Sequence, residues 1–217
     1  MKRIVIVGGH GKIAMSLAEL LSGRGHHVHS LIRNPDQEAD ISAKGAMPVV
    51  ADIEALSAEE LSEIFAGNDA IVFAAGAGGG SPERTYSVDR DAAIRTMDAA
   101  AHAGVHRYVM LSYKGASLEH GVPEDNDFFA YAEAKAAADD HLRKGPLQYT
   151  IVGPGALSSE PASGKIDVGD AATAEQASRD NVAHVIAAVI DSDNTIGHTI
   201  EFMDGSTQIT DAVAAIA

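Results

Sequence analysis

The fold is decided near the start of the chain by the stretch Ile4-Val5-Ile6-Val7-Gly8-Gly9-His10-Gly11-Lys12-Ile13-Ala14. Its continuous apolar run predicts a strand buried on both faces, and the glycines lead into an amphipathic helix. Gly8 permits the tight turn, Gly11 lets a ligand approach the backbone without meeting a Cβ atom, and Ala14 allows close helix packing. The helix N-terminus then favours an anion. A turn that needs glycine for its geometry alone is the alternative interpretation.

The same alternation of short apolar runs and longer amphipathic stretches continues along the chain, as is typical of strands joined by crossover helices. We expect strands at Arg3–Val7, His27–Ile32, Met47–Ala51, Ala70–Ala74, Tyr108–Ser112, Tyr149–Val152 and near Thr199–Met203. We expect helices at Lys12–Arg24, Ala58–Phe65, Arg84–Ala103, Asp127–Lys144, Arg179–Ile190 and a short one from Ile209. The sequence therefore predicts an α/β protein with a three-layer, doubly wound parallel sheet (Rossmann fold). Residues 1–217 are expected to form a single domain with a minimal C-terminal substrate region.

Three loops are candidates for the walls of a small substrate pocket. They are Gly76–Glu83, Lys114–Phe128 and Gly155–Ala174, all poor in periodicity. In a doubly wound sheet, such segments at the carboxyl ends of strands line the ligand crevice.

The composition excludes several classes of function. The formal net charge is −15 and no basic run exists, so we expect no nucleic-acid partner. Cysteine is absent, which removes disulfides, thiolate catalysis and cysteine-based zinc sites. The cluster of His26, His27 and His29 has no further ligand at metal-binding spacing, so we expect no metal site. Because no segment approaches the roughly 20 apolar residues of a membrane span, we expect a cytoplasmic protein without a membrane partner.

The end of the second strand indicates which dinucleotide the glycine turn would hold. An NAD(H) site usually has an acidic residue there for the ribose hydroxyls, whereas this strand ends with Ile32 and Arg33. The guanidinium of Arg33 suits a 2′-phosphate, which favours NADP(H) over NAD(H), although an exposed arginine is the alternative. Asp52, at the end of the third strand, is expected beside the adenine. His10 and Lys12 either add positive charge near the phosphates or are solvated turn residues.

Further motifs make the chain resemble a known family. Ala74-Ala75-Gly76 follows the fourth strand, and Tyr131-Ala132-Glu133-Ala134-Lys135 follows the fifth. With the glycine turn, these motifs resemble the short-chain dehydrogenase/reductase superfamily. They are most similar to its compact atypical branch of NmrA-like and NAD(P)-dependent epimerase-type proteins. The resemblance covers nearly the whole chain.

The resemblance implies a catalytic site. In that superfamily a Tyr and a Lys four residues later transfer protons while an upstream Ser polarises the substrate carbonyl, which assigns these roles to Tyr131, Lys135 and Ser112. The spacing places the first two on one helix face, where the ammonium is expected to lower the phenol's pKa from about 10. Tyr131 then acts as the acid in carbonyl reduction and the base in alcohol oxidation. Asp89 stands where larger relatives have Asn, and Gly153 where relatives often have Arg, which puts a copied proton relay and a substrate anchor in doubt.

The candidate residues surround one predicted crevice. The catalytic candidates are Tyr131, Lys135, Ser112 and Asp89. The cofactor-binding candidates are Gly8, Gly9, His10, Gly11, Lys12, Ile13, Arg33, Asp52, Ile53, Ala74, Ala75, Gly76, Lys135 and Pro154. The resemblance implies that Lys135 also holds the nicotinamide ribose and that Pro154 packs near the nicotinamide amide.

Three functions are consistent with these features. The first is an NADP(H)-dependent oxidoreductase that acts on a small carbonyl or alcohol. The second is a non-catalytic NADP(H)-sensing protein, as some NmrA-like relatives are, and the third is an epimerase or dehydratase. A small-molecule substrate and a monomer or homodimer are expected in the first case.

Overall fold

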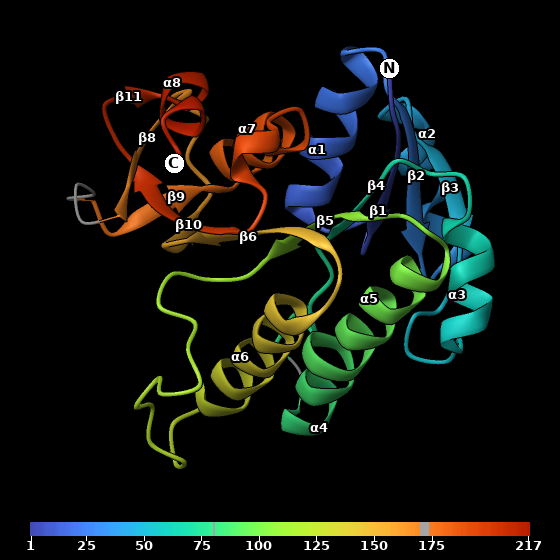
Figure 1. Cartoon of the computed structure of the whole chain (residues 1–217), viewed down its shortest axis with the longest axis horizontal. Coiled ribbons are helices and arrows are strands. Elements are labelled where there is room, and N and C mark those ends of the chain that lie inside the picture. The colour runs from blue at the N-terminus through green and yellow to red at the C-terminus, as the bar shows by residue number, and fades with distance from the viewer. Residues whose placement is uncertain (80, 170–173) are drawn as a thin grey trace.

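A twisted sheet runs through the centre of the molecule, with helices on both of its faces (Figure 1). The computed structural model describes residues 1–79, 81–169 and 174–217. The strands of the described part are β1 Arg3–Val7, β2 His27–Ile32, β3 Met47–Val50, β4 Ala70–Phe73, β5 Arg107–Leu111, β6 Gln148–Pro154, β7 Ala156–Ser158, β8 Lys165–Val168, β9 Gln176–Ser178, β10 His198–Asp204 and β11 Thr207–Gln208. The main sheet has the order β11-β8-β10-β6-β5-β4-β1-β2-β3, and β7 pairs with β9 in a small second sheet.

The sheet changes its winding direction at β1. This strand lies between β2 and β4 and is parallel to both. Successive crossovers therefore run outward from it in opposite directions, which confirms the predicted doubly wound fold. Ligands of such folds bind outside the carboxyl ends of the strands at this switch point, which here is the loop after β1 and the loop after β4.

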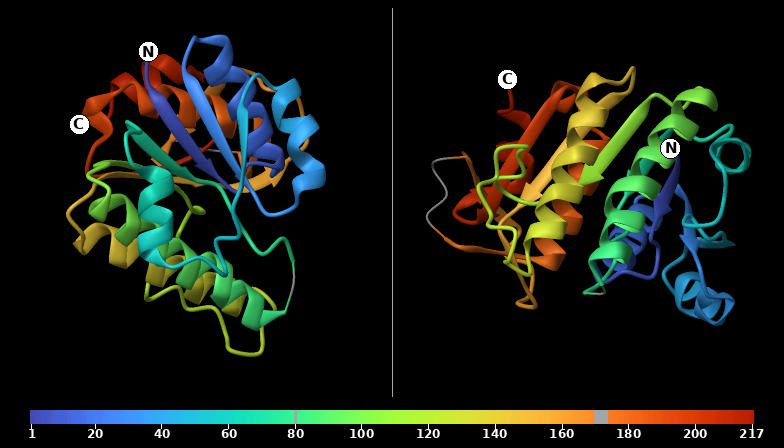
Figure 2. Two further views of the ribbon diagram at one scale, coloured as in Figure 1. Left: turned by 90° about the vertical axis from the view of Figure 1, so that its right-hand side faces the viewer. Right: turned by 90° about the horizontal axis from the view of Figure 1, so that it is seen from below.

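The two helical layers cover opposite faces of the sheet. In Figure 1, α1 Lys12–Gly23 and α7 Arg179–Ile190 lie above it, and α5 Ala93–His102 and α6 Phe129–Lys144 lie below. The second view of Figure 2 shows α5 and α6 side by side across the lower face. Side chains of β1 alternate between the two cores, since Ile4 and Ile6 join α1 and α7 in one, and Val5 and Val7 join the other.

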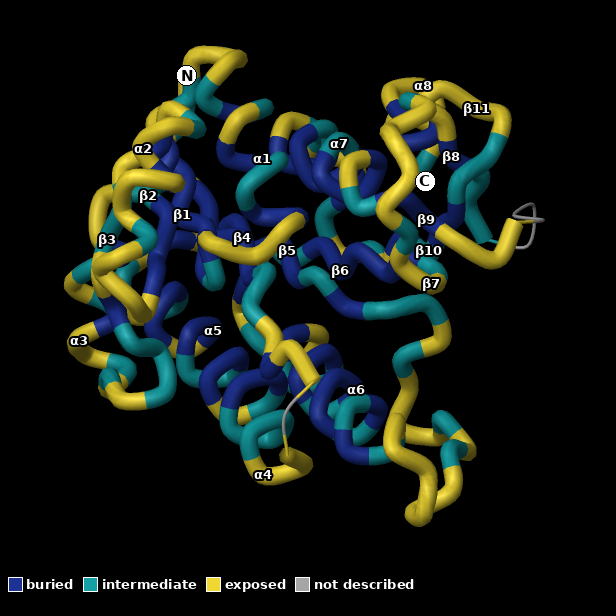
Figure 3. The backbone as a smooth tube through the Cα atoms, turned by 180° about the vertical axis from the view of Figure 1, so that it is seen from behind, coloured by how far each residue is buried: buried dark blue, intermediate teal, exposed yellow. Residues whose placement is uncertain are grey.

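The central strands are buried on both faces, as their apolar sequences predict. Figure 3 shows that β1, β4, β5 and β6 are buried over most of their length, whereas the edge strand β3 is exposed or partly exposed. α3 Ala58–Phe65, which begins with a capping box from Ser57 and Glu60, covers the sheet near this edge. None of the helices described here has the length and apolar character needed to cross a membrane.

Two helical segments differ from the prediction. A turn of 3₁₀ helix, η1 Pro35–Gln37, and the short helix α2 Glu38–Ala43 follow β2 where no element was expected. Only Ile41 of these residues is buried, so the sequence carries almost no periodic signal there.

The expected helix Arg84–Ala103 consists of α4 Pro82–Thr85, a π-helical segment η2 Tyr86–Ala92 and α5. The π segment matters because such segments are frequent at functional sites.

The C-terminal region is more regular than predicted. β10 is parallel to β6, but β8 is antiparallel to β10 and β11 is antiparallel to β8, so this end of the sheet is mixed. α8 Ile209–Ala214 packs beside it. The expected loop Gly155–Ala174 contains β7 and β8, and its residues 170–173 lie outside the described residues, as does residue 80 of the loop Gly76–Glu83.

Candidate functional site

The glycine turn after β1 forms a cradle that side chains would fill. Gly8 has a φ of +84°, and a Cβ atom there would lie 2.5 Å from the Cα atom of Ala75. Gly11 has extended backbone at the N-cap of α1, and its N–H donates to the Gly8 carbonyl at 3.0 Å. The first turn of α1 contains no acidic residue, so its free N–H groups and the positive end of the helix dipole face the crevice without a competing charge. This arrangement fits a pyrophosphate.

Gly9 serves packing more directly than ligand binding. Its N–H donates to the Leu31 carbonyl at 2.8 Å, and a Cβ atom would lie 2.6 Å from that of Ser30. Gly9 is also absent from the lining of both cavities at the crevice. It therefore holds the turn against β2, and its predicted contact with cofactor stays a prediction.

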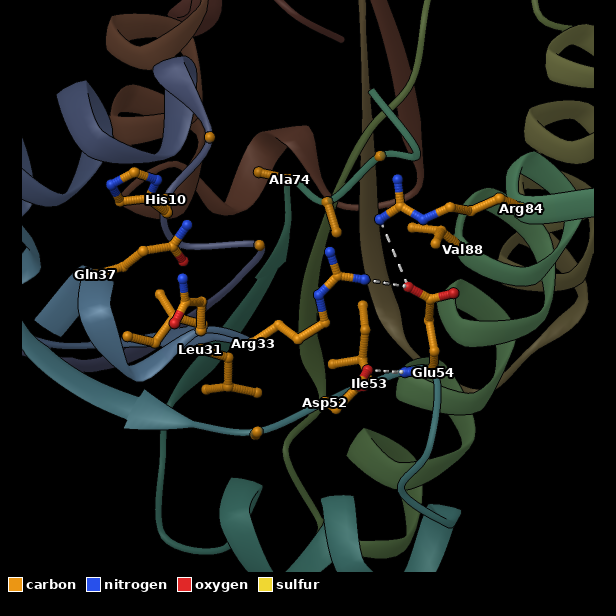
Figure 4. A pocket seen from close by; sticks show the side chains of 17 residues that line it. His10, Leu31, Arg33, Gln37, Asp52, Ile53, Glu54, Ala74, Arg84 and Val88 are labelled. Carbon is orange, nitrogen blue, oxygen red and sulfur yellow. Dashed lines mark hydrogen bonds and ion pairs between the residues drawn. The ribbon is translucent and has the colours of Figure 1, made fainter. Parts of the chain in front are cut away.

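The first cavity lies on the β2 side of the glycine turn and has a volume of about 370 Å³ (Figure 4). The predicted residues that line it are Gly8, His10, Gly11, Arg33, Asp52, Ile53, Ala74, Ala75 and Gly76. They come from the ends of the first four strands, where the doubly wound topology brings them together. The cavity has the position that the adenosine half of a dinucleotide takes in this fold.

Glu54 is a residue of this cavity that the sequence did not reveal. In Figure 4, Arg33 and Arg84 extend toward it from opposite sides. The Arg33 Nη1 atom lies 3.2 Å from the Glu54 Oε1 atom, and the Arg84 Nη2 atom lies 3.6 Å from the same oxygen. Arg33 is thus at the predicted place and 60% exposed, but it is paired with a carboxylate.

The other polar residues of the first cavity have local partners. Asp52 accepts a hydrogen bond from the Glu54 N–H at 3.0 Å, so one of its oxygens shapes the loop after β3. His10 lies 2.8 Å from a carboxylate oxygen of Asp40 in α2, the helix that was not expected. His10 therefore links the glycine turn to α2, and Lys12 lies on the other side of the turn.

The second cavity, of about 470 Å³, continues the crevice beyond the glycine turn. It shares Gly11, Ala74, Ala75 and Gly76 with the first cavity. The other predicted site residues in its lining are Lys12, Ile13, Asp89, Tyr131 and Lys135, and Leu157 of the predicted pocket loop Gly155–Ala174 joins them. The two cavities therefore flank the phosphate cradle, as the two halves of a dinucleotide require.

Lys135 is a buried ammonium at the floor of the second cavity. It is 1% exposed, and its Nζ atom donates to the Leu111 carbonyl at 2.6 Å, at the end of β5. Burial lowers the pKa of Lys135, while the charges of Asp139 and Asp89 oppose that shift. The helix position therefore directs the amine toward the end of the central strand, next to the switch point.

The environment of Tyr131 corrects one expectation. Burial raises the pKa of this phenol well above its ordinary value, and Asp89, Asp139 and Tyr113 raise it further. The expected lowering of this pKa by Lys135 is therefore wrong, because burial disfavours the phenolate most and the neighbouring carboxylates add to that effect. The ring packs against Phe128 at 5.3 Å and Tyr113 at 5.6 Å between centroids. Tyr131 is thus a protonated hydrogen-bond donor at neutral pH.

Ser112 does not line the cavity in which it was expected to polarise a substrate carbonyl. It is 3% exposed and lines neither of the two cavities, and its hydroxyl donates to Asp139 Oδ2 at 2.6 Å. Asp139 is fully buried, and its Oδ1 atom has no hydrogen-bond partner among the described residues. Burial raises the pKa of Asp139, with Lys135 and Ser112 acting in the opposite direction. Ser112 therefore supports a buried carboxylate; it does not face a substrate here.

Asp139 could have been found in the sequence, because it lies four residues after Lys135 on the same helix face. The spacing Tyr131, Lys135, Asp139 puts all three on one stripe of α6. An acidic residue in the middle of an otherwise Ala-rich helix face was the available signal.

Replacing Ser112 with alanine is expected to destabilise the fold by about 1–3 kcal/mol at pH 7, because Asp139 loses its hydroxyl donor while remaining buried. The pKa of Asp139 is higher in the folded than in the unfolded protein. Its protonation therefore stabilises the fold below its ordinary pKa of about 4, and this contribution is lost as the pH rises through its pKa in the folded protein. The cost of Ser112→Ala should therefore shrink on acidification. Thermal unfolding across pH measures it, and Ser112→Ala/Asp139→Asn should recover most of the loss. A cost that is independent of pH would contradict the assignment.

Asp89 holds the loop after β4. It is 1% exposed and accepts a hydrogen bond from the Ala77 N–H at 3.0 Å. Burial raises its pKa, against the opposing charge of Lys135. The π-helical segment η2 therefore positions a carboxyl group between this loop and the reactive end of the crevice.

Pro154 and Gly153 lie at the end of β6, away from the lining of both cavities. The Pro154 carbonyl accepts from the Lys114 N–H at 2.8 Å, which pins the start of the following loop. A Cβ atom at Gly153 would lie 3.2 Å from the Tyr113 carbonyl oxygen, so the backbone of Tyr113 takes the space of a side chain there. Their placement supports the loop, and the contact of Pro154 with the nicotinamide stays a prediction.

Comparison with known proteins finds similarity over nearly the whole chain. A family of NAD(P)H-binding proteins matches residues 8–193. The Bacillus subtilis protein named uncharacterized sugar epimerase YhfK is 34% identical over 214 residues, which cover 97% of this chain and 98% of that protein.

Two solved structures are similar over their full lengths. One, from Bacillus halodurans, is named as a candidate NAD-dependent epimerase/dehydratase; it has a TM-score of 0.90 and 36% identity, covering 98% of this chain and 99% of its own. The other is the oxidoreductase ylbE from Lactococcus lactis, with a TM-score of 0.86 and 30% identity, covering 99% and 96%. The chain therefore belongs to this family of NAD(P)H-binding proteins, which have the Rossmann-type fold.

Proposed function

We propose that this protein is an NADP(H)-dependent oxidoreductase of the atypical short-chain dehydrogenase/reductase type, acting on a small carbonyl or alcohol. The observation that carries the proposal is the arrangement of one crevice. An arginine suited to a 2′-phosphate lies at one end, and Tyr131 with the buried Lys135 lines the cavity at the other, with the glycine cradle between them.

The residues of the crevice fit the chemical groups of the cofactor. The N–H groups at the start of α1 would hold the pyrophosphate, Arg33 the 2′-phosphate, and the second cavity the nicotinamide half. When bound, the cofactor supplies or accepts a hydride. With a chain charge of −15, these local donors must overcome a repulsive global field, which explains why the cradle contains no acid.

Tyr131 is the group best placed to exchange the proton. In the reductive direction its O–H would donate to the carbonyl oxygen as the hydride adds to carbon, and solvent would return the proton to the phenol. Its raised pKa keeps the phenol protonated at neutral pH, which an acid needs before it can donate. Lys135, whose bond to the Leu111 carbonyl keeps the amine in position, would hold the nicotinamide ribose beside this phenol.

The first test of the reaction is NADPH oxidation by the purified protein against a panel of aldehydes, ketones and quinones. We expect turnover with at least one class. A protein that binds NADPH but oxidises it with none of these compounds would contradict the oxidoreductase proposal and favour the sensing function.

Arg33→Gln is expected to weaken NADPH binding by about tenfold while changing NADH binding by less than about twofold. The reason is that only NADPH carries the phosphate that the guanidinium would contact. Isothermal titration calorimetry measures both affinities. Arg143→Gln is a matched control, since Arg143 donates to the Thr199 hydroxyl at 3.3 Å and lines neither cavity. An equal loss for both dinucleotides would contradict the role of Arg33.

The sensing function has a specific observation in its favour. Ser112 is engaged with Asp139, and Asp89 stands where larger enzymes have an amide donor, so the reactive end lacks two groups of the full relay. The epimerase or dehydratase alternative is supported by the names of the Bacillus relatives. Such a reaction would consume no net NADPH, which the same assay distinguishes by product analysis.

A further inference from the structure

Three charged side chains meet at the adenosine end of the crevice. Glu54 lies within 3.2 Å of Arg33 and 3.6 Å of Arg84 through the same carboxylate oxygen. Its other oxygen accepts from the Ser87 hydroxyl at 3.2 Å. The carboxylate is therefore the shared partner of both guanidinium groups in this cavity.

The three side chains differ in how firmly they are held. Arg33 is 60% exposed, Arg84 39% and Glu54 25%. Arg84 also donates to the Ala77 carbonyl at 2.6 Å, which fixes the orientation of its guanidinium. Glu54 and Arg84 thus form the fixed part of the cluster, while Arg33 is the exposed arm that can turn toward a ligand.

The net charge of the cluster decides what it can bind. Two guanidinium groups and one carboxylate leave a single positive charge, whereas a 2′-phosphate carries close to two negative charges. Glu54 repels that phosphate and also competes with it for the same N–H donors. Unphosphorylated ribose hydroxyls are neutral, so they do not experience this repulsion.

We propose that Arg84 binds the 2′-phosphate together with Arg33, and that Glu54 competes with this phosphate for the two guanidinium groups. Glu54 thereby limits the selectivity of the crevice for phosphorylated over unphosphorylated adenine dinucleotides. This inference rests on the proposed function, because it concerns the affinity of the same crevice for NADP(H). It adds two specificity-determining residues that the strand-end pattern does not contain.

The competing interpretation makes an opposite prediction. A carboxylate in this region can accept hydrogen bonds from the ribose hydroxyls of NAD(H). Removal of the charge at Glu54 would then weaken NAD(H) and leave NADP(H) unchanged. The two roles are therefore separable by the direction of the change for each ligand.

The test is calorimetric titration of the whole protein with NADP⁺, NAD⁺, adenosine 2′,5′-bisphosphate and 5′-AMP. Glu54→Gln should tighten the two 2′-phosphorylated ligands by about five- to tenfold and change the other two by less than about twofold. Arg84→Gln should weaken the 2′-phosphorylated ligands by about tenfold with the same small effect on the others. Glu63→Gln, on the exposed face of α3, removes the same charge at a distance and should leave all four affinities unchanged.

Three results would overturn the inference. An unchanged NADP⁺ to NAD⁺ ratio in Glu54→Gln would show that the carboxylate does not compete, and weaker NAD⁺ binding would show that it accepts from ribose. Wild-type protein that binds neither dinucleotide would remove the proposed function and the inference together. In the first two results both dinucleotides still bind, so the proposed function survives and its failure is distinguished from that of the inference.

Discussion

Gly11→Val is expected to weaken NADPH binding by about 100-fold or more while the protein still folds. The backbone of Gly11 is extended, with φ −66° and ψ 150°, which valine adopts without strain. A Cβ atom there would lie 3.3 Å from the Gly8 carbonyl oxygen, and the branched side chain would cover the N–H groups that face the pyrophosphate. The change of N-cap residue should cost about 1 kcal/mol of folding free energy. Calorimetry with NADPH and a thermal unfolding curve measure the two effects.

Gly23→Ala is the matched control in the same helix. No atom lies within 4 Å of a Cβ built at Gly23, and its φ is not positive. Alanine should therefore stabilise α1 by about 0.5–1 kcal/mol without altering NADPH affinity. Wild-type NADPH affinity in Gly11→Val would show that the dinucleotide does not use this turn.

Tyr131→Phe is expected to reduce turnover by about 100-fold or more and to leave NADPH affinity within about twofold of the wild type. Only the O–H group is removed, and general acid catalysis typically contributes factors of this size. The ring still packs on Tyr113 and Phe128, so the fold should not change. Steady-state kinetics with the substrate found in the panel measures the effect.

The pH dependence gives a second readout for Tyr131. Its raised pKa keeps the acid protonated in the folded enzyme, so reduction should not lose this group as the pH rises from about 7 to about 9. Tyr149→Phe makes the same chemical change in β6, outside both cavities, and should retain wild-type turnover. Unchanged turnover in Tyr131→Phe would reject Tyr131 as the acid.

The elements that sequence reasoning predicted best are those with strong local signals. The strands at Arg3–Val7 and His27–Ile32 and the helices at Ala58–Phe65 and Arg179–Ile190 have the predicted ends. The apolar run that ends at Gly8 defines the first strand, Gly25 separates the second from the preceding helix, and side-chain caps at Ser57 and Ser178 start the two helices. The weak elements were missed because they bury too few side chains to leave a periodic apolar pattern in the sequence, as in α2, where only Ile41 is buried.

The residues of the candidate site also fall into a group that the sequence predicted and a group that it did not. Gly8, Gly11 and Ala74–Gly76 lie around the cavities as predicted, because their position follows from the ends of parallel strands at a switch point. Contacts that depend on the direction in which a side chain points could not be predicted from the sequence. Ser112 turns to Asp139 and Arg33 to Glu54, each across a separation that no periodic pattern encodes.

The π-helical segment explains one further difference. An i→i+5 turn within η2 has no signature in the sequence, yet it carries Ser87 beside Glu54 and Asp89 beside Ala77. The two ends of the crevice are therefore joined by one irregular helical turn. A regular helix over the same residues would shift these side chains relative to each other.

The most direct test of the central claim is calorimetric titration of the wild-type protein with NADPH and with NADH at the same ionic strength. We expect one NADPH per chain, bound about tenfold more tightly than NADH, because the 2′-phosphate meets Arg33 at the end of β2. Equal affinities, or no binding of either dinucleotide, would contradict the assignment of this crevice as an NADP(H) site.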